Sequence, residues 1–408
     1  MRRFLYLIYI YACGLVLLAS CCKDDPLTPA QTVGRPGETL ERTLIVYMAA
    51  ENSLWSFARS DSMELAEGLA KIGDDCRVVL YNDDDRSTRI CVGTKDTPLQ
   101  TVLAYDSDLV STDSATMASV LSYIVEHYPA RHYGLVFWSH ASGWLFQNAT
   151  RSSAPRRTFG IDNGRRSSSN AGTEMNIPTL RHVLEQLPHF DYLFFDACFM
   201  QNIEVAYELR NCADYIVASP AEIPGSGAPY HEILPQLTAV PADLEGLING
   251  YADYYVTGSG RNVFAGAELS VVQTSKLEDF AVATRPLIRQ LFGDHATPST
   301  SGVQYYVASS SWPTFTEGYD MENLFYRNCS ADDYAAWKSA LAEAVPYKRL
   351  TPQWTSAFTL RPMQMGDADH CTGVSLFVPS TAYEEQGWTQ NYRRLEWYDA
   401  VQMNQTGW

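Results

Sequence analysis

The chain has 408 residues, of which 46% are hydrophobic, and its 47 acidic and 30 basic side chains give a formal net charge of −17. This acidic surplus argues against nucleic acid and anionic membrane surfaces as partners, and it suits cationic substrates. Its nine cysteines contain no CxxC pair and are too sparse for a disulfide scaffold, so no metal-binding residue is assigned.

The first residues have the pattern of a secretion signal. Arg2 and Arg3 precede an apolar run over residues 4–18 that is too short for a comfortable membrane span. The run leads through Leu-Ala-Ser into Cys21, which resembles a bacterial lipobox, and residues 22–25 resemble the export tag of Bacteroidetes surface lipoproteins. We expect cleavage after residue 20, a lipid on Cys21 as the only membrane attachment, and a location on the outer membrane or cell surface. A plain signal peptide or a short anchor is the alternative.

A flexible tether, rich in Pro and Gly, is expected over residues 21–41. Beyond it the chain alternates apolar runs with helical patterns. The runs predict five buried strands at residues 44–48, 77–81, 133–138, 191–195 and 215–218. The intervening helices show apolar spacings of three and four residues, most clearly around residues 117–125. Such alternation predicts an α/β fold of three layers, with a mostly parallel central sheet and helices on both faces.

The later part of the chain is less regular. Residues 265–370 read as additions to the sheet domain, with a strand near 267–273 and helices near 275–292 and 331–345. A further buried strand is expected at residues 373–379, and residues 386–408 read as a C-terminal extension. Residues 145–176 form a polar insertion that carries several arginines, and a loop of this length is usually functional or disordered.

A histidine and a cysteine follow two of the predicted strands. His140 comes just after residues 133–138 and Cys198 just after residues 191–195, so both are expected at the carboxyl edge of the sheet. A thiolate beside an imidazole can attack a carbonyl, and the protonated imidazole can then protonate the leaving amine. The backbone N–H groups of Cys198 and Ala141 could bind the oxyanion. A buried structural cysteine and a hydrogen-bonded structural histidine are the alternative.

Several segments resemble the clostripain family of cysteine peptidases, peptidase family C11. They are residues 47–54 (YMAAENSL), 138–144 (WSHASGW), 196–198 (DAC), 218–227 and the late strand at 373–379. The resemblance extends over roughly residues 42–380. It implies a caspase-like domain at residues 42–385 that acts as a cysteine endopeptidase, through a His140–Cys198 dyad and an acyl-enzyme intermediate, with no cofactor required for the chemistry.

The resemblance also implies protein or peptide substrates that are cleaved after Arg or Lys. Asp196 matches a family aspartate that lines the pocket for this side chain, and Glu222 is a second candidate. The family has Gly after the catalytic His, where this chain has Ala141. An alanine there would be strained if the position needs a positive φ.

Self-cleavage and calcium are two further expectations from the resemblance. Family members can cut themselves between the His and Cys segments, so Arg151, Arg156 and Arg157 in the basic insertion are candidate cleavage sites, unless the insertion is never cut. Calcium could bind acidic side chains such as those of residues 83–85. Solvated turn acids are the competing interpretation of that run, and no calcium site is assigned.

Two other functions compete with a peptidase. A caspase-like surface lipoprotein that binds protein segments without cleaving them would account for Ala141. A glycan-binding surface lipoprotein could use the nine Trp and 25 Tyr for stacking, although these aromatics are scattered along the chain. The sequence leaves the oligomeric state open.

Overall fold

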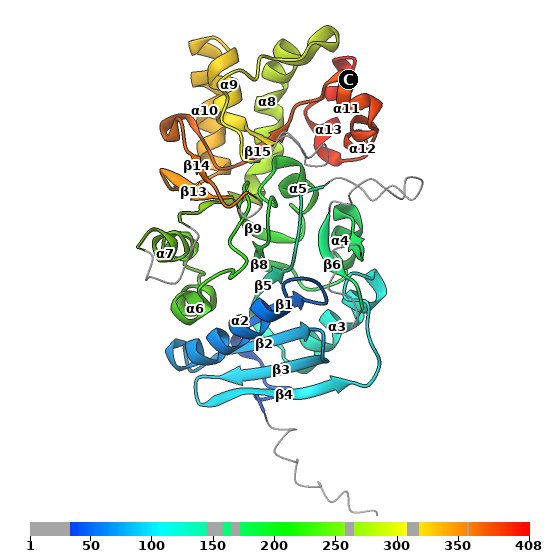
Figure 1. Cartoon of the computed structure of the whole chain (residues 1–408), viewed down its shortest axis with the longest axis vertical. Helices are drawn as coiled ribbons and strands as arrows, with labels where there is room; N and C mark the ends of the chain where they lie inside the picture. Colours follow the sequence, from blue (N-terminus) through cyan, green and yellow to red (C-terminus); the bar gives the residue numbers. More distant parts are fainter. Residues whose placement is uncertain (1–32, 145–157, 165–171, 258–264, 308–317, 357–358) are drawn as a thin grey trace, which may run out of the picture. The chain divides into compact units, whose positions relative to one another are not determined.

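The structure is a computed structural model that describes residues 33–144, 158–164, 172–257, 265–307, 318–356 and 359–408. A nine-stranded sheet runs through the body formed by residues 33–408, in the order β12-β10-β9-β8-β5-β1-β2-β3-β4 (Figure 1). Its strands are β1 (Leu40–Ala49), β2 (Cys76–Asp83), β3 (Thr88–Thr94), β4 (Thr97–Tyr105), β5 (Ala130–Trp138), β8 (Phe190–Asp196), β9 (Ala213–Ala218), β10 (Glu268–Gln273) and β12 (Tyr347–Leu350).

The five middle strands of this sheet, from β9 to β2, are parallel, whereas the pairs at both edges are antiparallel. The middle strands are the five that the apolar runs predict. They are buried on both faces, and their side chains alternate between two cores. In β1, Leu44 and Val46 face one core while Ile45 and Tyr47 face the other. Because successive side chains of a strand point to opposite faces, each of these apolar runs supplies side chains to both cores.

Helices cover the two faces as the prediction of three layers requires. One face carries α2 (Trp55–Gly68), α6 (Tyr230–Thr238) and α7 (Leu244–Thr257). The opposite face carries α3 (Ser114–His127), α4 (Ile177–Leu184) and α5 (Ile203–Glu208). In Figure 1, α6 and α7 lie on one side of β5, β8 and β9, and α3 and α4 lie on the other. The α/β fold with a mostly parallel central sheet between helical layers is confirmed.

The C-terminal part extends the core on the α5 side. Helices α8 (Leu277–Phe292), α9 (Met321–Asn328) and α10 (Ala331–Ala344) are followed by α11 (Thr381–Glu385), α12 (Trp388–Tyr392) and α13 (Glu396–Ala400). Short antiparallel pairs join β11 (Gly318–Asp320) to β15 (Ser375–Phe377) and β13 (Gln353–Thr355) to β14 (Pro362–Gln364). Residues 386–408 belong to this packed body, because Trp397 and Trp408 are buried in the same core as α5.

The insertion between the His and Cys segments is partly structured. Its described residues form a hairpin of β6 (Phe159–Asp162) and β7 (Thr173–Met175), where the sequence predicts only a loop. Among the described residues, no helix has the length and apolar character needed to span a bilayer.

Candidate active site

The register of the sheet places His140 and Cys198 at the same level. Trp138 at the end of β5 pairs with Asp196 at the end of β8, and each of the two candidate residues follows two positions later. His140 and Cys198 therefore leave neighbouring parallel strands at one edge of the sheet, as the sequence predicts. No hydrogen bond joins their side chains directly among the described residues.

The Cys198 thiol lies beneath the loop that follows β9. The Ile223 backbone N–H donates to Cys198 Sγ at 3.4 Å, and Ile223 O lies 3.9 Å from the sulfur. Burial raises the pKa of the Cys198 thiol to about 12; the Ile223 N–H opposes this shift, and the nearby carboxylates of Glu222 and Asp196 add to it. The Cys198 thiol is thus protonated at neutral pH.

The chain turns sharply just after the nucleophile. Phe199 has a φ of 60°, a left-handed conformation that is uncommon for a residue with a bulky side chain. The Phe199 N–H donates to Ala221 O at 3.0 Å, which ties this turn to the same loop that contacts Cys198. Strained backbone of this kind is often found where an active site must fix one group.

His140 contacts a side chain that the sequence analysis did not single out. Its Nε2 atom lies 2.9 Å from Ser53 Oγ, in the turn after β1. Burial lowers the pKa of His140 to about 4, and burial is the only cause of this shift. The imidazole is therefore neutral at physiological pH. Ser53 follows the carboxyl end of β1, the other neighbour of β5, but no local sequence pattern shows that its hydroxyl turns toward His140.

The main chain around Ala141 is arranged to leave its N–H free. Ala141 faces Phe159 of β6 in an antiparallel bridge, and the flanking bonds run from Gly160 N to His140 O (2.9 Å) and from Ser142 N to Thr158 O (3.2 Å). In such a pair the two opposed residues direct their own N–H groups away from the partner strand. Among the described residues, neither the Ala141 N–H nor the Cys198 N–H donates to a protein acceptor, so both are available to an oxyanion.

Ala141 is also unstrained. It is not among the described residues with positive φ, and the left-handed position in this segment is Gly143, with a φ of 92°. The strain that would accompany an alanine in place of the family glycine is therefore absent.

Asp196 lies under the loop that follows β9. It is 2% exposed, and its Oδ2 accepts hydrogen bonds from Ala228 N (2.9 Å) and Tyr230 Oη (2.8 Å). Its Oδ1 is buried and has no hydrogen-bond partner in the described part of the chain. Burial raises the pKa of Asp196 to about 6. Asp196 thus both orders this loop and keeps one buried oxygen for a donor.

A second carboxyl group stands close to Asp196. Asp61 of α2 accepts a hydrogen bond from Trp138 Nε1 at 2.7 Å. A Cβ added to Gly227 would lie 2.7 Å from Asp196 Oδ2 and 3.0 Å from Asp61 Oδ2, so no larger residue fits between the two acids. Glu222 is also buried, at 4% exposure. The structure therefore places Asp61 of α2 beside Asp196, and Glu222 in the loop after β9 near Cys198.

The acidic run at residues 83–85 is not a solvated turn. Asp83 and Asp84 are buried. Asp84 pairs with Arg59 and Arg89, and Asp85 pairs with Arg59, so the three aspartates do not share one ligand site.

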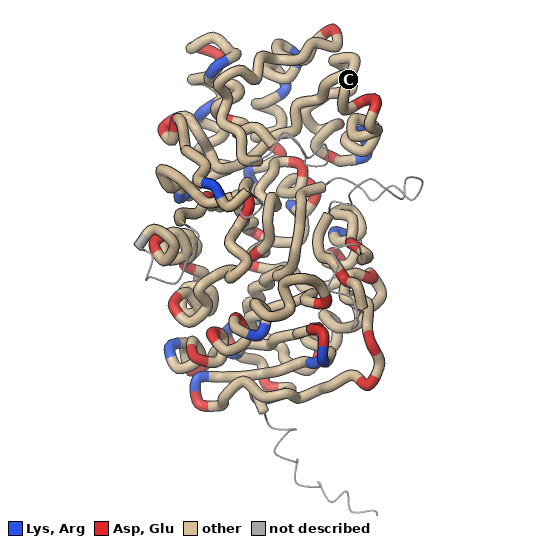
Figure 2. The backbone as a smooth tube through the Cα atoms, in the orientation of Figure 1, with Lys and Arg blue, Asp and Glu red and all other residues tan. Residues whose placement is uncertain are grey.

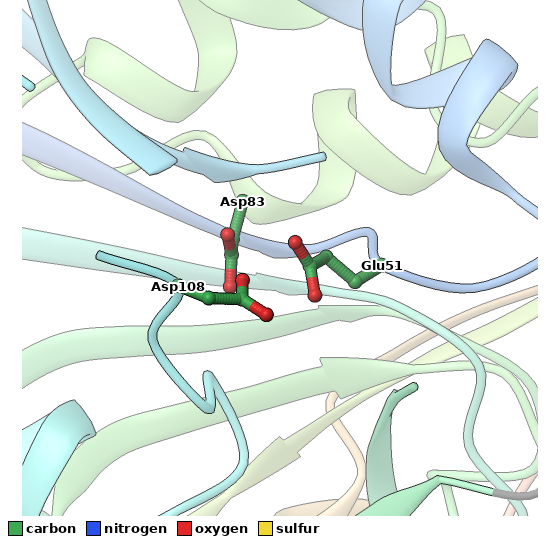
Figure 3. Close-up of side chains that lie close together, drawn as sticks. All are labelled: Glu51, Asp83 and Asp108. Atoms are coloured by element: carbon green, nitrogen blue, oxygen red, sulfur yellow. The ribbon is translucent and has the colours of Figure 1, made fainter. Parts of the chain in front are cut away.

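Asp83 instead meets Glu51 and Asp108, and the candidate ligand atoms of these three lie within 4.8 Å of one another (Figure 3). An all-oxygen set of this size fits Ca²⁺. Burial raises the pKa of Glu51 to about 9 and that of Asp83 to about 7, so without a cation the cluster holds protons. Calcium dependence stays a prediction.

The remaining candidates lie outside the described residues. Cys21 belongs to residues 1–32, and Arg151, Arg156 and Arg157 belong to residues 145–157. Lipidation and self-cleavage at these positions therefore stay predictions.

Comparison with known families decides the class of the protein. The model of the clostripain family matches residues 46–408. The chain belongs to the clostripain family. It is therefore a cysteine-type peptidase, and the resemblance found in its sequence is confirmed. Among curated proteins, none matches the chain.

Solved structures of C11 proteases share this fold. A secreted C11 cysteine protease from Bacteroides thetaiotaomicron, in complex with an irreversible peptide inhibitor, is 30% identical and has a TM-score of 0.75; the match covers 89% of this chain and 99% of that one. An inactive zymogen C11 protease from Parabacteroides distasonis is 27% identical, with a TM-score of 0.73 and the same coverage. A second secreted protease from Bacteroides thetaiotaomicron, iotapain, is 21% identical with a TM-score of 0.72 over 89% of this chain and 99% of that chain, which supports the fold alone.

Proposed function

We propose that this clostripain-family peptidase is an endopeptidase that works through a Cys198–His140 dyad. The observation that carries the proposal is the register of β5 and β8, which brings the two residues to one edge. The N–H groups of Ala141 and Cys198, which have no acceptor in the described part of the chain, belong to the same place. The unstrained Ala141 removes the feature that favoured a binding protein without activity.

The proposed reaction starts from a neutral thiol and a neutral imidazole. His140 takes the thiol proton as Cys198 Sγ attacks the peptide carbonyl, and the oxyanion accepts bonds from the Ala141 and Cys198 N–H groups. Such a donor is typically worth about 3 kcal/mol of transition-state stabilisation. The imidazolium then protonates the leaving amine, the C–N bond breaks, and water hydrolyses the thioester with His140 as the base.

Covalent labelling tests the dyad. An irreversible arginyl peptide inhibitor should label Cys198 in the wild type, and mass spectrometry of the digested protein locates the label. Cys198→Ala should lose both the label and hydrolysis of an arginyl reporter, and His140→Ala should lose at least about 100-fold in kcat, the range expected for a general acid–base group. Cys329→Ala is the matched control, because Cys329 is a partly exposed thiol just after the end of α9. A label that stays after Cys198→Ala would refute the assignment.

For specificity we propose a basic side chain, Arg or Lys, on the amino side of the cleaved bond. The support is the buried oxygen of Asp196 and the buried Glu222, both close enough to Cys198 to raise its pKa. A guanidinium or ammonium group would offset their charge, and hydrogen bonds to charged groups contribute about 1.5–3 kcal/mol each. A matched pair of reporters with Arg or its neutral analogue citrulline tests this. Wild type should prefer Arg at least 10-fold, and Asp196→Asn or Glu222→Gln should shrink that ratio, whereas equal ratios in all three proteins would contradict it.

Maturation and location complete the proposal. We propose self-cleavage at Arg151, Arg156 or Arg157, supported by their place between the two catalytic segments. Intact-mass measurement during incubation should show two fragments in the wild type and one chain in Cys198→Ala.

We also propose export with a lipid on Cys21, in line with the secreted relative that is 30% identical. Metabolic labelling with a fatty acid should fail for Cys21→Ala.

The proposed chemistry assigns no step to a metal or cofactor. If calcium matters, it acts through binding to a site such as the cluster of Glu51, Asp83 and Asp108. Activity measured in EDTA and after calcium is restored tests this.

A further inference from the structure

We propose that Ser53 is the positioning residue of the catalytic histidine. Ser53 Oγ lies 2.9 Å from His140 Nε2, a normal hydrogen-bond distance. This inference rests on the proposed dyad and adds a third member to it. A group that holds one imidazole nitrogen decides which tautomer the other nitrogen presents to the reaction.

The turn that carries Ser53 is fixed by its neighbour Asn52. Asn52 is 1% exposed, and its Nδ2 donates to Ala49 O at 2.9 Å and to Ile161 O at 2.8 Å. Its Oδ1 accepts from Leu54 N at 2.9 Å, which closes the turn around Ser53. The hydroxyl therefore stands on a backbone that is anchored to both β1 and β6.

The histidine backbone is held by the same strand. Gly160 of β6 donates to His140 O at 2.9 Å, and Ser139 Oγ donates to Ala49 O at 2.7 Å. Ser53 and His140 thus sit on two segments that β1 and β6 lock together. This frame fixes the two backbones relative to one another, while the Ser53 side chain itself is exposed.

The contact leaves His140 Nδ1 for chemistry. Among the described residues, Nδ1 has no protein partner, whereas Nε2 has Ser53. When the Nε2–H donates to Ser53 Oγ, the Nδ1 lone pair is free to accept the thiol proton. The imidazolium that forms keeps the same Nε2–H bond, and its Nδ1–H can then be donated to the leaving amine. One serine acceptor therefore serves both proton transfers.

A neutral hydroxyl beside His140 does not raise the pKa of the imidazole, as a carboxylate would. Ser53 is neutral, and no charged group among the described residues shifts the pKa of His140, which is lowered by burial alone. The acids nearest to the site, Asp196 and Glu222, act on Cys198 instead, while Glu51 of the Ser53 turn contacts the carboxyl group of Asp108. The chain thus orients the imidazole without raising its basicity.

Substitutions at Ser53 separate this role from a merely structural one. Ser53→Ala should lower kcat roughly 10- to 100-fold, a part of what general acid–base catalysis contributes, with KM changed less than about threefold. Ser53→Thr keeps the hydroxyl and should retain at least a third of kcat. Ser53→Asp places a carboxylate on Nε2, which favours the imidazolium, so the acidic limb of kcat/KM should move up by at least one pH unit. Ser60, whose hydroxyl donates to Ser56 O on the exposed side of α2, is the matched control in the same three substitutions.

A second readout does not depend on turnover. The rate at which iodoacetamide alkylates Cys198, followed against pH by mass spectrometry, should change its profile in Ser53→Asp and not in the Ser60 variants. Wild-type kcat in Ser53→Ala, or an acidic limb that stays in place in Ser53→Asp, would overturn the inference while Cys198→Ala remains inactive. If Cys198→Ala keeps its activity, the proposed dyad itself fails.

Discussion

Ala141 stands where the resemblance to the clostripain family implies a glycine, and the structure gives it an ordinary backbone. Its φ is not positive, and its N–H has no protein acceptor among the described residues. We therefore expect Ala141→Gly to leave kcat/KM within about twofold of the wild type. The glycine should also lower stability by roughly 0.5–1 kcal/mol, because it loses more conformational freedom on folding.

Steady-state kinetics with an arginyl reporter and thermal unfolding of the same samples measure both effects. Gly143→Ala, at a neighbouring position with a φ of 92°, is the contrasting variant and should be strained. A tenfold rise in activity for Ala141→Gly would show that alanine misplaces the oxyanion donor.

The two reactive residues could be predicted from sequence because each follows a clear apolar strand. Ser53 and Ile223 could not be singled out in the same way. Ile223 contributes only backbone atoms to Cys198, so its residue type carries no signal. Ser53 acts through a loop conformation that is set by Asn52, and nothing local in the sequence shows where that hydroxyl points. Local sequence pattern also does not show which side chains of neighbouring strands meet, such as Asp83 at the end of β2 and Glu51 after β1.

At the scale of elements, the junction of β1, β5 and β6 is held by one buried amide. Asn52→Ala would leave Ile161 O and Leu54 N without this partner, while Ala49 O would keep the Ser139 hydroxyl as its donor. Each buried unsatisfied group costs about 1–3 kcal/mol. We expect a loss of stability of at least about 2 kcal/mol and a larger loss of kcat than of substrate binding, because the turn that carries Ser53 loosens.

Denaturant unfolding and kinetics at a temperature where both proteins are folded measure these losses. Asn52→Asp is the informative companion, since it keeps the acceptor for Leu54 N and removes the two donors. An Asn52→Ala protein with wild-type stability would contradict the role of this amide.

The elements that escaped prediction are those without a continuous apolar run. Strand β4 is an edge strand whose residues are mostly half-exposed or exposed, so it lacks the signature of a buried strand. Its hairpin partner β3 was not predicted either. Helix α6 contains Pro235, which masks a helical pattern. The five parallel strands, in contrast, are buried on both faces, and burial of that kind shows directly in composition.

At the scale of the whole molecule, acidic and basic residues both occur along most of the described chain, as Figure 2 shows. Several of the carboxyl groups are buried, and burial shifts their pKa values. Burial raises the pKa of Asp196 and Asp320 to about 6, of Asp83 and Glu204 to about 7, and of Glu51 to about 9. These carboxyl groups are protonated in the folded protein over a pH range in which the unfolded chain has already released its protons.

This difference sets the direction of the pH dependence of stability. For Glu51 the window runs from the ordinary value of 4.5 to about 9, and for Glu204 it runs from 4.5 to about 7. Within each window the folded state binds more protons, so the free energy of unfolding falls as the pH rises, by about 1.4 kcal/mol per pH unit for each group. We expect the thermal midpoint to fall from pH 5 to pH 9.

Scanning calorimetry in EDTA, which keeps divalent cations out of the Glu51 cluster, measures this slope. Glu51→Gln has no proton to lose and should flatten the decline up to pH 9. Glu204→Gln should flatten it only below pH 7, because its window closes there. Glu67→Gln, on the exposed side of α2, is the control and should follow the wild type. A wild-type midpoint that rises between pH 5 and pH 9 would mean that these buried acids are ionised in the folded protein, most simply because an internal cation or water offsets their charge.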